Sequence, residues 1–164
     1  MKNILLAINH GYYFWGTSVY VGLLWSLHFI FYPSWQSINA DSIAEHFLVP
    51  VNAATSFFTF VVPFMLLAGL VMIYFEWKTS QRWTALLAYG SLLLMMVVGG
   101  FLIRPVNEWI AAALEKGNVD SLLLQEQLKD WMLYNDMRLL IMTTMWIILL
   151  VYFYKKNNLI KTLS

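Results

Sequence analysis

Residues 131–138 read WMLYNDMR and stand where a polar segment becomes an apolar one. Residues 118–130, just before them, are rich in Gln, Glu, Lys and Asp, whereas residues 139–154 carry no charge. Arg138 is therefore a cation at the beginning of a membrane helix. Asn135 and Trp131 share its helical face, because they lie three and seven residues earlier. Polar groups at bilayer depth are costly unless they are paired, so we expect this face to look into a bundle or a cavity.

The composition is that of a membrane protein. The chain has 164 residues, of which 60% are hydrophobic and 12% are charged, whereas a soluble domain carries about 25% charged residues. This length predicts one membrane-embedded domain over residues 1–164. The net charge of +1 gives no electrostatic case for binding nucleic acid. The chain has no Cys, which excludes disulfides, thiolate metal sites and Cys nucleophiles.

Four apolar segments are candidates for membrane helices. They are residues 11–32, 51–75, 83–103 and 139–154. Pro33 is expected to end the first, because the residue before a proline disfavours helical backbone. The fourth is expected to begin near Ser121 and to project out of the bilayer, because no Gly or Pro interrupts residues 121–156.

The connection between the third and fourth segments also has a helical pattern. Pro105 suits the first turn of a helix, residues 106–116 are amphipathic, and Gly117 is a stop signal. The predicted fold class is therefore all-α: a four-helix transmembrane bundle with a short extra amphipathic helix between helices 3 and 4.

The distribution of Lys and Arg predicts the orientation in the membrane. One side of the bilayer receives Lys2, Lys78, Arg82, Lys155, Lys156 and Lys161, and the other receives Arg104, Lys116, Lys129 and Arg138. The second group is diluted by six acids. We therefore expect an integral protein of a bacterial inner membrane, with both termini in the cytoplasm and the connections 33–50 and 104–138 together outside.

With this topology, polar side chains gather at the outer end of the bundle, and a stripe of Asn52, Ser56, Thr59 and Pro63 follows one face of helix 2. We expect a pocket under the outer loops, with a polar rim and a wall of Met and Trp below. The predicted ligand-binding residues are Asn52, Arg104, Asn107, Trp131, Asn135, Arg138, Met142 and Trp146. His28 lies one turn short of the outer end of helix 1 and at bilayer depth, which favours a functional role.

The same residues also have structural interpretations, which the sequence leaves open. Arg104 and Arg138 are long enough to reach lipid headgroups. Ser56 and Thr59 are of the type that forms hydrogen bonds between membrane helices. Met142 is of the type that fills gaps in a core.

The histidines do not form a metal-binding pattern. His10 and His28 share a helical face but are roughly 27 Å apart along the axis. His46 reaches His28 only if the outer loop folds back, and the membrane segments contain no pair of ligands at metal-binding spacing. No metal and no cofactor is therefore predicted.

Residues 104–110 (RPVNEWI) and 131–138 (WMLYNDMR) resemble the anthrone oxygenase-like family of small four-helix membrane proteins. The Tyr32-Pro33 end of helix 1 and residues 62–65 (VPFM) are also similar to that group. Where members often carry His after the Asn, this chain has Asp136.

The resemblance implies an enzyme that converts a reduced polycyclic phenol to a quinone without metal or flavin. A base removes a proton from an activated carbon, and the resulting carbanion reduces O₂. His28 and Asp136 are the base candidates that the resemblance implies, and Arg104 and Arg138 are the anion stabilisers.

Two functions from different classes are therefore open. One is a cofactor-independent oxygenase or oxidoreductase acting on a small lipophilic molecule. The alternative is a non-catalytic binding or accessory membrane protein that holds a lipid, quinone or haem, or a partner subunit. The expected partners are membrane lipid and a small lipophilic or quinone-like ligand, with a homo-oligomer as a further arrangement.

Overall fold

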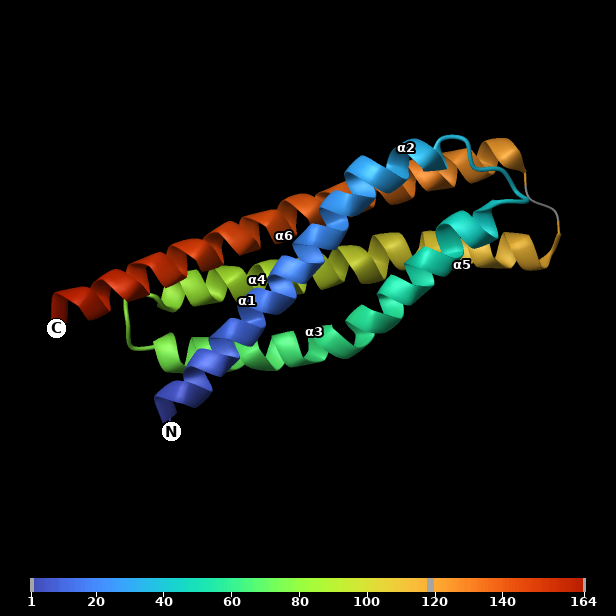
Figure 1. Ribbon diagram of the computed structural model, residues 1–164. Helices are drawn as coiled ribbons and strands as arrows, with labels where there is room; N and C mark the ends of the chain where they lie inside the picture. Colours follow the sequence, from blue (N-terminus) through green and yellow to red (C-terminus); the bar gives the residue numbers. More distant parts are fainter. Residues whose placement is uncertain (1, 118–119, 164) are drawn as a thin grey trace.

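The computed structural model describes residues 2–117 and 120–163. Within them, four helical segments are long and apolar enough to cross a membrane by length and composition: Ile4–Trp35, Ala44–Glu76, Arg82–Glu115 and Ser121–Lys156. They pack as a bundle (Figure 1). No strand occurs among the described residues. The prediction of an all-α four-helix transmembrane bundle is confirmed.

Each segment contains the following elements. The first comprises α1 (Lys2–Ser26), the π-helical turn η1 (Leu27–Phe31) and α2 (Tyr32–Trp35); the second comprises η2 (Ala44–Leu48) and α3 (Val49–Glu76); the third comprises α4 (Arg82–Val98), η3 (Gly99–Ile103) and α5 (Arg104–Glu115); the fourth is α6 (Ser121–Leu163).

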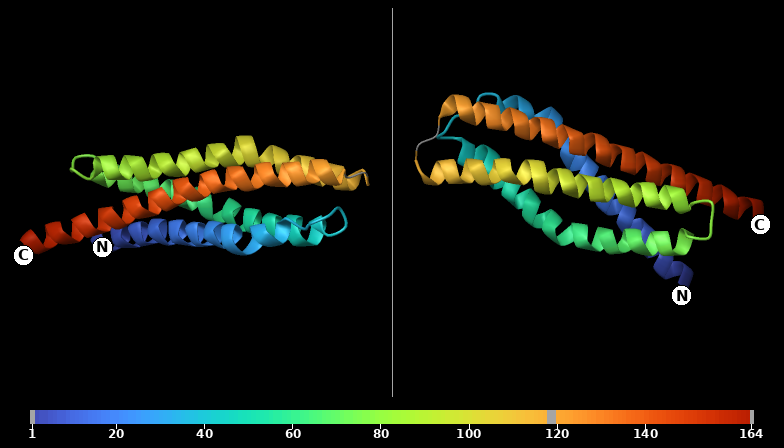
Figure 2. Two further views of the ribbon diagram at one scale, coloured as in Figure 1. Left: turned by 90° about the horizontal axis from the view of Figure 1, so that it is seen from above. Right: turned by 180° about the vertical axis from the view of Figure 1, so that it is seen from behind.

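The bundle has two distinct ends. The turn between α3 and α4 lies beside the beginning of α1 and the end of α6, and we call this the terminal end (Figure 2). The opposite end holds α2, α5 and the beginnings of α3 and α6, and we call it the proline end because it carries Pro33, Pro50 and Pro105 (Figure 1). The two longer connections lie at the same end of the bundle, as expected, and the side of the membrane on which that end lies stays a prediction.

Each π turn ends two residues before a proline. The backbone N–H of the residue preceding the proline bonds the carbonyl five residues earlier: Tyr32 to Leu27, Val49 to Ala44 and Arg104 to Gly99. Proline lacks an N–H, and its ring clashes with the carbonyl four residues earlier in a regular helix. The wider π turn accommodates the ring, so all three helices continue through the proline.

Two expected helix boundaries are therefore wrong. Pro33 does not end the first helix, which continues through η1 to Trp35. The short helix expected at residues 106–116 begins at Arg104 and follows η3 directly, without an intervening connection. At Pro33 the π turn relieves the steric conflict from which a helix end was predicted.

The prediction of one long fourth helix is confirmed. α6 is α-helical from Ser121 to Leu163, with no break between Asp130 and Arg138. Its beginning is capped by Asp120, whose Oδ1 accepts a hydrogen bond from the backbone N–H of Leu122 at 2.9 Å. α6 therefore carries side chains from the proline end to the terminal end on a single rigid element.

The hydrophobic core is divided into two clusters of buried residues. One fills the bundle from its middle to the terminal end and includes Tyr13, Met65 and Leu92. The other fills the proline end and includes Trp35, with Trp131 packed edge-on against it at 5.4 Å between ring centroids. The junction between these clusters is where the candidate site lies.

The terminal end also holds a buried carboxylate, Glu76, which is 4% exposed. Its Oε1 accepts hydrogen bonds from Tyr152 Oη at 2.6 Å and Lys156 Nζ at 2.5 Å. Its Oε2 accepts a third from Thr79 Oγ1 at 2.7 Å. Both carboxylate oxygens are thus engaged, and the group joins α3 to α6.

Candidate functional site

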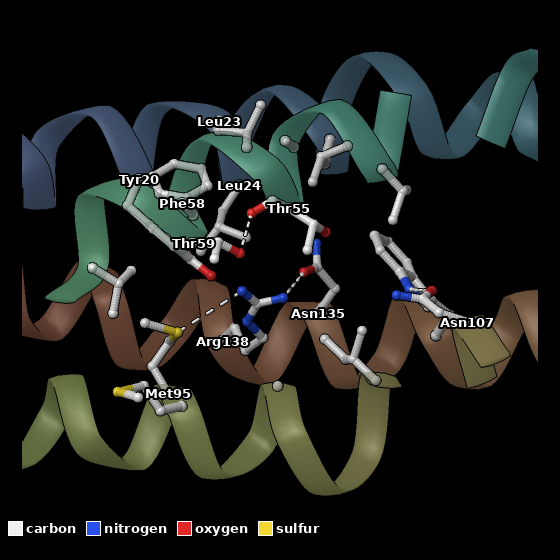
Figure 3. A pocket seen from close by; sticks show the side chains of 18 of the residues that line it. Tyr20, Leu23, Leu24, Thr55, Phe58, Thr59, Met95, Asn107, Asn135 and Arg138 are labelled. Atoms are coloured by element: carbon white, nitrogen blue, oxygen red, sulfur yellow. Dashed lines mark hydrogen bonds between the residues drawn. The ribbon is translucent and has the colours of Figure 1, made fainter. Parts of the chain in front are cut away.

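A cavity of about 330 Å³ lies between the helices at the junction of the two core clusters (Figure 3). Members of both clusters line it, including Tyr20 and Met95 from the first and Ile103 and Trp131 from the second. Most of its wall is apolar. Its polar lining residues are Thr55, Thr59, Asn107, Asn135 and Arg138.

The π turns shape this cavity. Leu27 and Phe31 of η1 line it, and so do Gly99 and Gly100 of η3. Pro50, which lies two residues after η2, also lines the cavity. π turns break regular helix packing and occur often at functional sites. The π turns and one of the prolines that follow them thus form part of the cavity wall.

Arg138 enters the cavity from α6 (Figure 3). One Nη donates to Asn135 Oδ1 at 3.4 Å and the other to Met95 Sδ at 3.8 Å. The guanidinium carbon lies 5.3 Å from the centroid of the Tyr20 ring. These partners provide weak contacts and no negative charge. Nε is buried and has no hydrogen-bond partner among the described residues.

The small residue opposite Arg138 permits this position. A Cβ on Gly99 would lie 3.9 Å from both the guanidinium carbon and Nε of Arg138. The guanidinium therefore lies close to the η3 backbone. Two acids of the segments 131–138 and 104–110 could offer a negative charge, but Asp136 pairs with His28, and Glu108 pairs with Arg104. Neither pairing involves Arg138.

A hydrogen-bonded frame holds the polar wall. Asn135 is 1% exposed and donates from Nδ2 to Tyr32 Oη at 3.0 Å, and Tyr32 Oη donates to the carbonyl of Met132 at 3.2 Å. Trp131 Nε1 donates to Asn107 Oδ1 at 2.9 Å, which connects α6 to α5. Because α2, α5 and α6 are connected in this way, these hydrogen bonds hold the side chains around Arg138 in place.

The structure brings together half of the residues predicted to bind a ligand. Asn107, Trp131, Asn135 and Arg138 all line the cavity, although they come from two elements. Their convergence agrees with the expectation that Trp131, Asn135 and Arg138 share one face of a helix, because seven residues make about two turns.

The other four predicted ligand residues lie outside this lining. Arg104 is exposed, and its Nε donates to Glu108 Oε1 at 2.7 Å. Asn52 is also exposed. Met142 is fully buried in the core cluster, and Trp146 donates from Nε1 to Ser18 Oγ at 3.0 Å. The expected convergence of Arg104 and Asn52 with Arg138 is wrong, because their helical positions direct them to the outside of the bundle.

The two predicted catalytic residues form a pair. His28 Nδ1 lies 2.9 Å from Asp136 Oδ1, which joins η1 to α6. The two side chains are 38% and 36% exposed and do not line the cavity. Asp136 follows Asn135 by one residue, which rotates it about 100° around the helix and away from the Asn135 face.

Sequence reasoning missed Tyr20, Thr55, Met95 and Gly99 as parts of the site. The Gly99-Gly100 pair was a usable signal, because adjacent glycines in a membrane helix permit close approach of another group. Within the described residues, no group of three or more His, Asp or Glu side chains is arranged to hold a metal ion.

Comparison of the chain with protein-family models, with curated proteins and with solved structures found no match. Membership of the anthrone oxygenase-like family therefore stays a prediction.

Proposed function

We propose that this chain is an integral membrane protein that binds a small lipophilic ligand carrying an anionic or electron-rich group, held against Arg138. The observation that supports this proposal is the buried Nε of Arg138, which has no hydrogen-bond partner among the described residues and lies at an apolar cavity. A buried charge without a partner is strongly unfavourable. A ligand that supplies the missing acceptor would remove that cost.

Binding is supported better than chemistry inside the cavity. A proton-abstracting base must lie within hydrogen-bond reach of the atom on which it acts. The lining residues include no His, Asp or Glu. Tyr20, Asn135 and Arg138 instead provide an aromatic face, an amide and a cation, which suit recognition of a planar or anionic group.

A cofactor-independent oxygenase or oxidoreductase is the second candidate. The specific observation in its favour is the 2.9 Å contact between His28 Nδ1 and Asp136 Oδ1, because a carboxylate that orients an imidazole is a common arrangement for a general base. The substrate would have to reach this pair from the outer surface of the bundle, where both side chains are more than one third exposed. In this case, O₂ consumption with a reduced polycyclic phenol exceeds the protein-free rate and is lost in His28→Ala.

Native mass spectrometry of protein purified in mild detergent tests the binding proposal. Wild type is expected to retain a stoichiometric small ligand, and Arg138→Gln is expected to lose it while remaining a folded bundle. Arg138→Lys should also lose most of the ligand, because a lysine ammonium does not reproduce the planar, paired N–H donors of a guanidinium. Arg104→Gln is the matched control, since Arg104 is exposed and lies outside the cavity. Equal retention by Arg138→Gln and wild type contradicts the proposal.

We also propose that the protein resides in a bacterial inner membrane with both termini in the cytoplasm, on the basis of the Lys and Arg distribution. The chain is naturally free of Cys, so single cysteines at positions 40 and 79 report the two ends of the bundle. An impermeant thiol reagent applied from outside should label position 40 and leave position 79 unlabelled. The reverse result means an inverted topology.

A further inference from the structure

The cavity has one exposed side. Of the residues that line it, four are exposed: Thr55, Thr59, Met96 and Gly100. Thr55 and Thr59 belong to α3, Met96 belongs to α4, and Gly100 belongs to η3. The remaining lining residues are buried or partly buried. The cavity therefore opens sideways between α3 and α4.

The opening faces the region that lipid would occupy. Exposed large apolar side chains flank it on both helices, with Phe57 and Phe60 on α3 and Val97 on α4. In a helix that crosses a membrane, such a surface contacts acyl chains. Gly100 adds no bulk to this side, because a Cβ built there would meet nothing within 4 Å.

We propose that the cavity takes the headgroup of a single-chain anionic amphiphile, a long-chain carboxylate, which enters from the bilayer between α3 and α4 past Gly100. This inference rests on the proposed binding function and specifies its ligand and its route. The carboxylate lies against Arg138, and the chain leaves through the side opening into lipid.

The charge of the site favours a carboxylate. Arg138 is the only Lys or Arg among the lining residues, so one negative charge neutralises it. A planar guanidinium with a free Nε presents adjacent donors that match the two oxygens of a carboxylate. Asn135 Nδ2 is already engaged with Tyr32 Oη, so few donors remain for a larger phosphate group.

The size and depth of the site favour a single chain. A cavity of about 330 Å³ is at the small end of ligand pockets, which range over about 300–1,000 Å³. It accommodates a headgroup and the first part of one chain. Arg138 packs at the level of Gly99, five residues below Arg104, which corresponds to about 7 Å along a helix. The exposed Arg104 is of the type that reaches lipid headgroups, and a carboxylate about 7 Å below that level leaves its chain at the depth of the acyl chains.

The test uses the full chain in nanodiscs of phosphatidylcholine, with isotope-labelled palmitate as the probe and methyl palmitate as its uncharged counterpart. Wild type is expected to bind about one palmitate per chain. Its affinity for the ester should be lower by about tenfold or more, because the ester lacks the charge that contacts Arg138. Gly100→Leu fills the opening and should slow palmitate exchange about tenfold or more. Gly90→Leu is the matched control. Gly90 lies on α4, which leads into η3, and like Gly100 it is exposed and free of neighbours around a Cβ, but it lies outside the lining.

The outcomes separate this inference from the function on which it depends. A polycyclic phenol, 1-hydroxypyrene, is offered in parallel. If wild type binds it, Arg138→Gln does not, and palmitate fails to bind, the binding function stands and the carboxylate assignment is overturned. If neither probe binds, both proposals fall. If palmitate exchanges equally fast in Gly100→Leu and wild type, the side route is overturned.

Discussion

Arg138 and Glu76 are both ionisable side chains inside the bundle, but their surroundings differ. Glu76, at the terminal end, accepts hydrogen bonds from Tyr152, Lys156 and Thr79. Arg138, toward the proline end, contacts an amide oxygen, a thioether and an aromatic ring, and its Nε lacks a partner among the described residues. One group is fully satisfied by the protein, and the other is not.

The packing around the two groups differs in the same way. At the terminal end, a Cβ added to Gly69 would lie 2.6 Å from Tyr89 Cδ2, so the helices there are in close contact. Beside Arg138, a Cβ on Gly99 would meet nothing nearer than 3.9 Å. A charge that is satisfied within a close-packed region contributes to the fold. The unsatisfied charge beside a hollow is the basis of the proposal that a ligand binds there.

The largest expected effect is on stability at the terminal end. Glu76→Ala removes the acceptor shared by Lys156 and Tyr152, and we expect it to lower the free energy of unfolding by about 3 kcal/mol. This lies at the lower end of the range for buried pairs, because the Lys156 side chain is 33% exposed and can extend to water. Equilibrium unfolding in mixed detergent micelles, followed by circular dichroism, measures it.

Glu108→Ala is the control for that prediction. Glu108 also pairs with a cation, Arg104, but the two side chains are 63% and 75% exposed. Exposed pairs contribute about 0–1 kcal/mol, so this variant should unfold almost like wild type. Equal losses in Glu76→Ala and Glu108→Ala would remove the distinction between a buried and a surface pair.

The second prediction compares two glycines and has an intermediate effect. Gly69→Ala forces a methyl group against Tyr89, and overpacking costs about 1–3 kcal/mol, which a gain of about 1 kcal/mol in helix propensity partly offsets. A net loss of up to about 2 kcal/mol is expected. Gly99→Ala has room, so it should be neutral or more stable by up to about 1 kcal/mol. The same unfolding assay measures both variants.

The difference between these two glycines tests whether the packing contrast is real. If Gly99→Ala destabilises as much as Gly69→Ala, the region beside Arg138 is packed as closely as the terminal end. The cavity would then be absent under the conditions of the assay, and the ligand proposal would lose its physical basis.

The smallest expected effect concerns His28 and Asp136. Their pair is more than one third exposed on each side, so a double-mutant cycle of His28→Ala and Asp136→Ala should give a coupling energy below about 1 kcal/mol. Ligand retention should be unchanged in both variants, because neither residue lines the cavity. A loss of ligand in either variant would extend the site beyond Arg138 to this pair.

Much of the fold could be predicted from the sequence because it depends on local patterns. The apolar lengths indicate four membrane helices, and the uninterrupted residues 121–156 indicate the long α6. A shared helical face predicts that Trp131, Asn135 and Arg138 act together, and all three line the cavity. These inferences require only the period of a helix and the cost of polar groups in hydrocarbon.

The tertiary structure decided how the helices meet and which polar groups remain unpaired. A proline alone indicates a helix end, but the three π turns carry the helices through Pro33, Pro50 and Pro105. Arg104 and Arg138 look alike in the sequence, yet Glu108 one turn away satisfies Arg104 on the surface, while Arg138 faces Gly99 across the bundle. The Arg104–Glu108 pair is local, but whether Arg138 finds a partner depends on contacts between helices distant in the chain, and a local pattern holds no information about those contacts.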